Sequence, residues 1–134
     1  MIWVIDTSAL IRLFVPDGPV PPEAEAALNR AASGTDSMLA PQLLLAEAAN
    51  VLLRKSRRGE LSAQELQEIL QVIVALPIRL VEHGFLLQPA IALAQSHNLS
   101  AYDALYLALA EHHGARLVTC DDALAKVAHG LGLA

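Results

Sequence analysis

The sequence predicts an α/β protein with three layers, α/β/α, around a central, mainly parallel sheet of four or five strands. Short apolar segments typical of buried strands alternate along the chain with longer segments of helical periodicity. Hydrophobic residues make up 54% of the chain and charged residues 17%, so many elements must be covered on more than one face. The 134 residues suit one domain, spanning residues 1–134, with one substantial core.

The first strand is expected at residues 2–5, because IWVI is short, β-branched and apolar throughout. That composition is typical of a strand buried on both faces of a parallel sheet. Similar segments follow at SMLAP (37–41), IRLVE (78–82) and ARLVT (115–119). These four segments account for the strands of the predicted sheet.

Helices are expected between and after these strands. The segments with helical periodicity are 8–14, 23–33, 42–58, 62–76, 86–97, 101–113 and 121–130. A proline-rich loop at 15–22 leads into the second helix, Gly59 stops the third helix at C′, and Ser62 caps the fourth. The chain ends in GLGLA, without a further strand segment.

Several protein classes are excluded by the sequence. No apolar segment reaches the roughly 18 residues that a membrane span needs. MIWVID meets an acid at residue 6 and lacks a basic leader, so it is interpreted as a strand and not as a signal peptide, and a soluble cytoplasmic protein is expected. Cys120 is the single cysteine, which permits neither an internal disulfide nor a thiolate zinc site.

Four acids stand in apolar surroundings, whereas the others, Asp17 and Asp36 among them, are predicted to be solvated. Asp6 and Asp121 each follow a predicted strand. Because the carboxyl ends of parallel strands lie on one edge of a sheet, both acids should face the same crevice. The two remaining acids, Glu47 and Asp103, lie inside apolar helical segments.

Each of these acids also has a purely structural interpretation. Asp6 and Asp121 could cap the helices that follow them, and Ser100-Ala-Tyr-Asp103 fits a capping box. Glu47 could belong to a solvated polar stripe with Asn50 and Arg54. The functional hypothesis is that the four acids converge.

Convergence of the acids would require a counter-charge. Two charges about 4 Å apart repel by roughly 4 kcal/mol at an effective dielectric constant near 20, so protonation or a cation must relieve the repulsion. Oxygen ligands suit Mg²⁺ or Mn²⁺. Such an ion can bind phosphate oxygens, activate water and stabilise a leaving oxygen, which points to nuclease chemistry.

Four segments resemble the acidic motifs of the PIN-domain ribonucleases, especially the VapC toxins of toxin–antitoxin pairs. They are VIDTSALI, LLLAEAANVLLR, LSAYDALYLALA and LVTCDDAL, in the family's order and spacing over almost the whole chain. The resemblance implies a PIN-like fold and a Mg²⁺- or Mn²⁺-dependent endoribonuclease. Its catalytic residues and metal ligands would be Asp6, Glu47, Asp103 and Asp121.

The resemblance also implies supporting residues and partners. Thr7, Ser8 and Thr119 match hydroxyl positions beside the family's acids, although a helix cap is the preferred interpretation of Ser8. An RNA substrate and a cognate antitoxin protein are implied as partners. Apolar surface on the segments 62–76 and 86–110 favours a homodimer, although core packing could also explain these residues.

A basic segment offers a weak nucleic-acid contact. RKSRR, residues 54–58, holds four of the nine basic residues of a chain whose net charge is −5. That net charge argues against coating of nucleic acid by bulk electrostatics but leaves room for a local patch. Arg54 is the best candidate for a phosphate contact and Arg12 a weaker one; solvated cations at a helix C-terminus are the alternative.

Two other functions fit the same residues. The first is another Mg²⁺-dependent phosphohydrolase with Asp6 as nucleophile, although Ser8 stands where such enzymes usually carry a second acid. The second is a catalytically silent PIN-like interaction module.

Overall fold

Four parallel strands form one sheet in the computed structural model, which describes residues 1–134. The strands are β1 (Ile2–Ile5), β2 (Ser37–Pro41), β3 (Arg79–Val81) and β4 (Arg116–Val118). Their order is β3-β2-β1-β4, so β1 is central and β4 pairs with its free side. Val4 and Ile5 are completely buried, as their apolar sequence predicts. The predicted strands are confirmed, and two of them, β3 and β4, are one residue shorter at each end than predicted.

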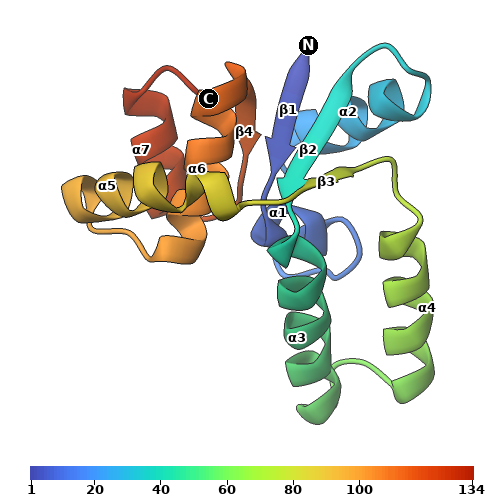
Figure 1. The fold of residues 1–134 in the computed structure, drawn as a ribbon. Helices are drawn as coiled ribbons and strands as arrows, with labels where there is room; N and C mark the ends of the chain where they lie inside the picture. The colour runs from blue at the N-terminus through green and yellow to red at the C-terminus, as the bar shows by residue number, and fades with distance from the viewer.

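Seven α-helices and one 3₁₀ turn connect and cover the strands (Figure 1). They are α1 (Thr7–Arg12), α2 (Pro22–Ala32), α3 (Leu43–Arg57), α4 (Ala63–Val74), η1 (Gly84–Leu86), α5 (Leu87–His97), α6 (Ala101–His113) and α7 (Asp122–Gly130). Every predicted helix is present. The 3₁₀ turn was not predicted, because three residues carry no periodic pattern. The α/β prediction is confirmed.

Helix α6 lies at the centre of the hydrophobic core. Residues 104–110 are all buried, and α6 contacts β1, β2 and β4, with α5 packed on its outer side (Figure 1). The uniformly apolar sequence of this helix therefore serves burial on all sides. The expectation that the segment 86–110 offers apolar surface is wrong for residues 104–110, which are buried. Tyr102, at the start of α6, is 64% exposed.

Helices α3 and α4 form a hairpin that extends away from the sheet (Figure 1). Gly59 ends the first helix with a φ of 79°, a left-handed conformation that suits glycine. Ser62 begins the second helix in a complete capping box with Glu65. The hairpin places Glu47 near the sheet and the basic residues of α3 toward its far end.

Asp36 organises the opposite edge of the sheet and is not the solvated loop acid that was predicted. Its carboxylate accepts hydrogen bonds from Trp3 Nε1 at 3.0 Å, from Arg30 Nε at 2.7 Å and from the amino group of Met1 at 3.2 Å. The Arg30 guanidinium, followed by the Trp3 indole, holds the pKa of this carboxyl far below its usual range. The network ties β1 to the start of β2.

No fifth strand forms at the C-terminus, but the chain returns to the sheet. Leu117 N in β4 donates to Leu133 O at 2.7 Å, and Leu133 is buried. This backbone hydrogen bond pairs one amide on the otherwise open edge of β4. None of the helices is long and apolar enough to cross a membrane.

Candidate active site

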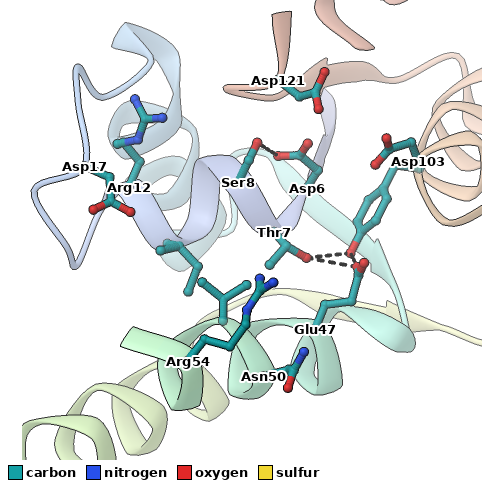
Figure 2. A pocket seen from close by; sticks show the side chains of 13 residues that line it. Asp6, Thr7, Ser8, Arg12, Asp17, Glu47, Asn50, Arg54, Asp103 and Asp121 are labelled. Atoms are coloured by element: carbon teal, nitrogen blue, oxygen red, sulfur yellow. Dashed lines mark hydrogen bonds between the residues drawn. The ribbon is translucent and has the colours of Figure 1, made fainter. Parts of the chain in front are cut away.

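The four acids that stand in apolar sequence surroundings line one cleft of about 380 Å³ (Figure 2). The cleft opens at the carboxyl ends of β1 and β4. The chain builds β2 and β3 on one side of β1 and then crosses to add β4 on the other, which is the switch point where ligands bind in open α/β sheets. The lining residues are Asp6, Thr7, Ser8, Ile11, Arg12, Asp17, Glu47, Asn50, Val51, Arg54, Asp103, Tyr106 and Asp121.

Asp6 is buried at the base of the cleft, with 4% of its surface exposed. Its Oδ1 accepts hydrogen bonds from Ala9 N at 3.0 Å and Ser8 Oγ at 2.8 Å, and its Oδ2 accepts one from Thr119 Oγ1. Asp6 is therefore the N-cap of α1 and a cleft residue at once. Burial raises its pKa to about 6 against the lowering effect of these hydrogen bonds, and the nearby Asp103 charge adds to the rise.

Ser8 and Thr119 tie the ends of β1 and β4 together around Asp6. Ser8 Oγ accepts a hydrogen bond from Cys120 N at 2.9 Å and lies 3.2 Å from Thr119 Oγ1. Thr119 Oγ1 in turn accepts one from Asp121 N at 3.0 Å. The expectation that Ser8 caps the helix is wrong, because Asp6 occupies the cap and Ser8 lies in the first turn.

The Glu47 side chain is fixed by hydrogen bonds from residues of α1 and α6 (Figure 2). Its Oε1 accepts hydrogen bonds from Thr7 Oγ1 at 3.0 Å and Tyr106 OH at 2.6 Å, and the two hydroxyls lie 3.0 Å apart. Burial, followed by the adjacent Glu47 carboxylate, raises the pKa of Tyr106 far above its usual range, so the phenol keeps its proton. Sequence reasoning missed Tyr106, although its position three residues after Asp103 places both on neighbouring turns of one helix face.

Asp103 makes only half of the predicted capping box. Ser100 Oγ accepts a hydrogen bond from Asp103 N at 3.1 Å, but the Asp103 carboxylate does not bond to the Ser100 amide in return. That carboxylate faces the cleft instead (Figure 2). Burial first, and then the charges of Asp121 and Glu47, raise its pKa. Asp121 also caps a helix, since its Oδ1 accepts from Leu124 N at 2.9 Å.

The polar stripe of α3 lines the cleft, where Glu47 is half-buried and Asn50 and Arg54 remain exposed to solvent. Asn50 and Arg54 line the cleft with Glu47, and the Arg54 side chain extends toward the acids (Figure 2). Lys55, by contrast, is buried with 7% exposure and pairs with Asp17, so it contributes nothing to a basic patch, and Asp17 is not a simple solvated acid. Arg12 donates to Pro19 O at 3.1 Å, which holds it against the proline-rich loop.

The sequence from residue 3 to residue 130 matches the PIN domain family. The chain belongs to this family. It is 35% identical over 125 residues to ribonuclease VapC3 of Pyrobaculum aerophilum, covering 92% of each chain, and 32% identical over 132 residues to ribonuclease VapC3 of Mycobacterium tuberculosis, covering 96% of this chain and 91% of the relative. A Pyrobaculum aerophilum crystal structure superposes with a TM-score of 0.69 at 24% identity, covering 91% of this chain and 81% of that one. These matches confirm the resemblance and the fold.

The donor chemistry of this PIN domain cleft suits a hard divalent cation. The acids of its lining offer only oxygen, with neither cysteine nor histidine beside them. No group of three or more His, Cys, Asp or Glu side chains is drawn together closely enough to hold an ion as it stands. Burial, followed by the charges of Asp121 and Glu47, raises the pKa of Asp103, so the acids repel one another and a cation would relieve that repulsion. The residues therefore fit a cation by chemistry and charge.

Replacing Asp6 with Asn should stabilise the protein in EDTA at pH 7.5. A pKa raised from 3.8 to about 6 means that the native state binds more protons than the unfolded state between about pH 4 and 6, so the free energy of unfolding falls as pH rises through this window. At about 1.4 kcal/mol per pKa unit, Asp6→Asn should gain about 1–3 kcal/mol. Asn can still cap α1 and can donate to Thr119 Oγ1.

Urea unfolding at pH 5 and pH 7.5 measures this effect. The advantage of Asp6→Asn should shrink at pH 5. The exposed Asp122→Asn serves as the control and should stay within about 0.5 kcal/mol of the unmodified chain. An Asp6→Asn variant less stable than the unmodified protein at pH 7.5 would show that the charged carboxylate is well accommodated.

Proposed function

We propose that the chain acts as one PIN domain over residues 1–134, a Mg²⁺- or Mn²⁺-dependent endoribonuclease that hydrolyses RNA phosphodiester bonds in the cytoplasm. We further propose that it is the toxin of a VapBC-type pair. The observation that carries the proposal is the meeting of Asp6, Glu47, Asp103 and Asp121 in one cleft. Two relatives at 35% and 32% identity that bear the name ribonuclease VapC3 support it.

The proposed ligands of the cation are the same four acids. A bound divalent ion would offset their charge, polarise the scissile phosphate and activate the attacking water. Asp6 presents a carboxylate fixed by Ala9, Ser8 and Thr119. Glu47 presents Oε2, which has no hydrogen-bond partner in the protein, since both donors bind Oε1. Water, held among these acids, is the proposed nucleophile.

The geometry argues against a phosphohydrolase in which Asp6 is the nucleophile. Such a mechanism needs an accessible carboxylate oxygen, yet Asp6 is 4% exposed and both of its oxygens accept hydrogen bonds. Ser8, which occupies the position where a second acid would stand, donates to Asp6 itself. Oδ2 accepts only the Thr119 hydrogen bond and keeps a second lone pair, which can still bind a cation.

Asp6→Asn or Asp103→Asn should abolish RNA cleavage while the protein remains folded, because each substitution removes a negatively charged oxygen ligand. Cleavage of a labelled RNA with and without Mn²⁺, together with circular dichroism, tests this. Glu111→Gln, an exposed acid at the far end of α6, should cleave normally. Undiminished Mn²⁺-dependent cleavage by both Asp variants would refute the assignment, and failure of the unmodified chain to bind Mn²⁺ by calorimetry would favour the silent interaction module.

Arg54 is the proposed RNA contact, with Arg12 a weaker candidate. Arg54→Gln should raise the KM for RNA about three- to tenfold with little change in kcat, and should lower the slope of log affinity against log salt by about 0.7–1. Arg57→Gln is a matched control, because Arg57 lies on the same helix, is exposed and does not line the cleft. If the two substitutions had equal effects, Arg54 would contribute only to the overall charge of the helix and would not be a specific RNA contact.

A homodimer is proposed through exposed apolar residues of η1 and the start of α5. Phe85, Leu87 and Ile91 are 56%, 48% and 46% exposed, and large exposed apolar side chains close to one another in the chain favour an interaction surface. Leu87→Glu with Ile91→Glu should convert the dimer to a monomer in size-exclusion chromatography with light scattering, whereas Val74→Glu on α4 should not. A monomeric unmodified chain at high concentration would contradict this.

A cognate antitoxin protein is the second proposed partner. The family resemblance supports it. Helix α4 carries two exposed apolar side chains outside the proposed dimer face, Val72 and Val74, which are 49% and 62% exposed. Binding of an apolar segment there is consistent with helix-in-groove recognition.

A further inference from the structure

Three helices meet at a single carboxylate oxygen in this structure. Thr7 on α1 and Tyr106 on α6 both donate to Oε1 of Glu47 on α3, at 3.0 and 2.6 Å. Tyr106 is 2% exposed and is one of the largest fully buried side chains of the protein. The other oxygen, Oε2, accepts no hydrogen bond from the protein, although Glu47 lines the cleft.

The environment of Glu47 makes such a restraint necessary. Asp103 lies close enough for the Glu47 charge to act on it, and like charges push flexible side chains apart. Glu47 also stands on a hairpin that extends from the body of the protein (Figure 1). Two neutral donors can hold it against this repulsion without adding a positive charge, which would compete with a cation for the same carboxylate.

We propose that Tyr106 is a positioning residue that acts through Glu47: together with Thr7 it binds Oε1, so that Oε2 is left for a divalent cation in the cleft. This inference rests on the proposed function. A buried phenol could have satisfied its hydroxyl on a backbone carbonyl, as buried tyrosines commonly do. Here its acceptor is an acid of the site, shared with a second hydroxyl that lines the same cleft.

Tyr106→Phe tests the proposal, because it removes one oxygen and keeps the buried ring. We expect the Kd for Mn²⁺, measured by calorimetry on the full chain, to rise about tenfold, as is usual when a residue that orients a metal ligand is lost. The kcat at limiting Mn²⁺ should fall in parallel, and the KM for RNA should not change. Tyr102→Phe is the matched control, on the same helix and 64% exposed, and should behave as the unmodified chain.

Thr7→Val removes the second donor to Oε1 and provides an independent test should Tyr106→Phe fold poorly. It should weaken Mn²⁺ binding in the same direction. A purely structural role predicts a lower melting temperature of Tyr106→Phe in EDTA with an unchanged Kd for Mn²⁺, and that result would overturn the inference. If the unmodified chain itself neither binds Mn²⁺ nor cleaves RNA, the proposed function fails first.

Discussion

The burial of one carboxylate, Asp6, at the end of the central strand is the constraint on which the site depends. Desolvation opposes its charge, and no cationic side chain pairs with it; the offset comes from neutral donors, namely a backbone amide of α1 and the hydroxyls of Ser8 and Thr119. Those donors come from both sides of the switch point, since Thr119 follows β4 and Ser8 follows β1. The same contacts that join the ends of β1 and β4 therefore hold the acid in place. The hydrogen bonds to Asp6 offset only part of the desolvation free energy of its carboxylate. A bound cation would offset the remainder and so stabilise the folded protein.

Helix capping and site formation turn out to be the same property of these acids. In a parallel sheet each strand is followed by a helix whose free amides point toward the carboxyl edge, and a carboxylate that caps the helix is fixed at that edge. Asp6 and Asp121 do this directly, through Ala9 N and Leu124 N. Asp103 stands one turn further in, where Ser100 takes the capping role and leaves the carboxylate to the cleft. The sequence could not decide between a helix cap and a cleft residue because Asp6 and Asp121 are both.

Local sequence patterns predicted most of the fold and four acids of the cleft. Strand segments, the glycine stop at Gly59 and the Ser62 cap depend on neighbours within a few residues, so the sequence displays them. The features that escaped are pairs distant in sequence: Tyr106 with Glu47, Lys55 with Asp17, and Asp36 with Trp3, separated by 59, 38 and 33 residues. In each pair the local sequence around one partner gives no sign of the contact. A tyrosine in an apolar helix is predicted to be a core residue, and a lysine in a basic segment is predicted to be a surface residue. Their roles follow from packing, which periodicity does not encode.

The charge distribution along α3 bears on how a polyanion could approach this cleft. Glu47 lies at the end of α3 near the sheet, and Arg54 lies two turns further along the helix. Lys55 is buried in an ion pair with Asp17 and is not available to a ligand. The cleft of about 380 Å³ therefore holds five carboxylates, of which Asp17 is paired with Lys55, and two arginines, of which Arg12 is hydrogen-bonded to the Pro19 carbonyl. Such a cleft repels phosphate, and two arginines do not reverse its sign. A divalent cation would then be needed for the substrate to enter as well as for the chemistry, and the positively charged end of α3 would orient the RNA backbone only after the acids have been neutralised.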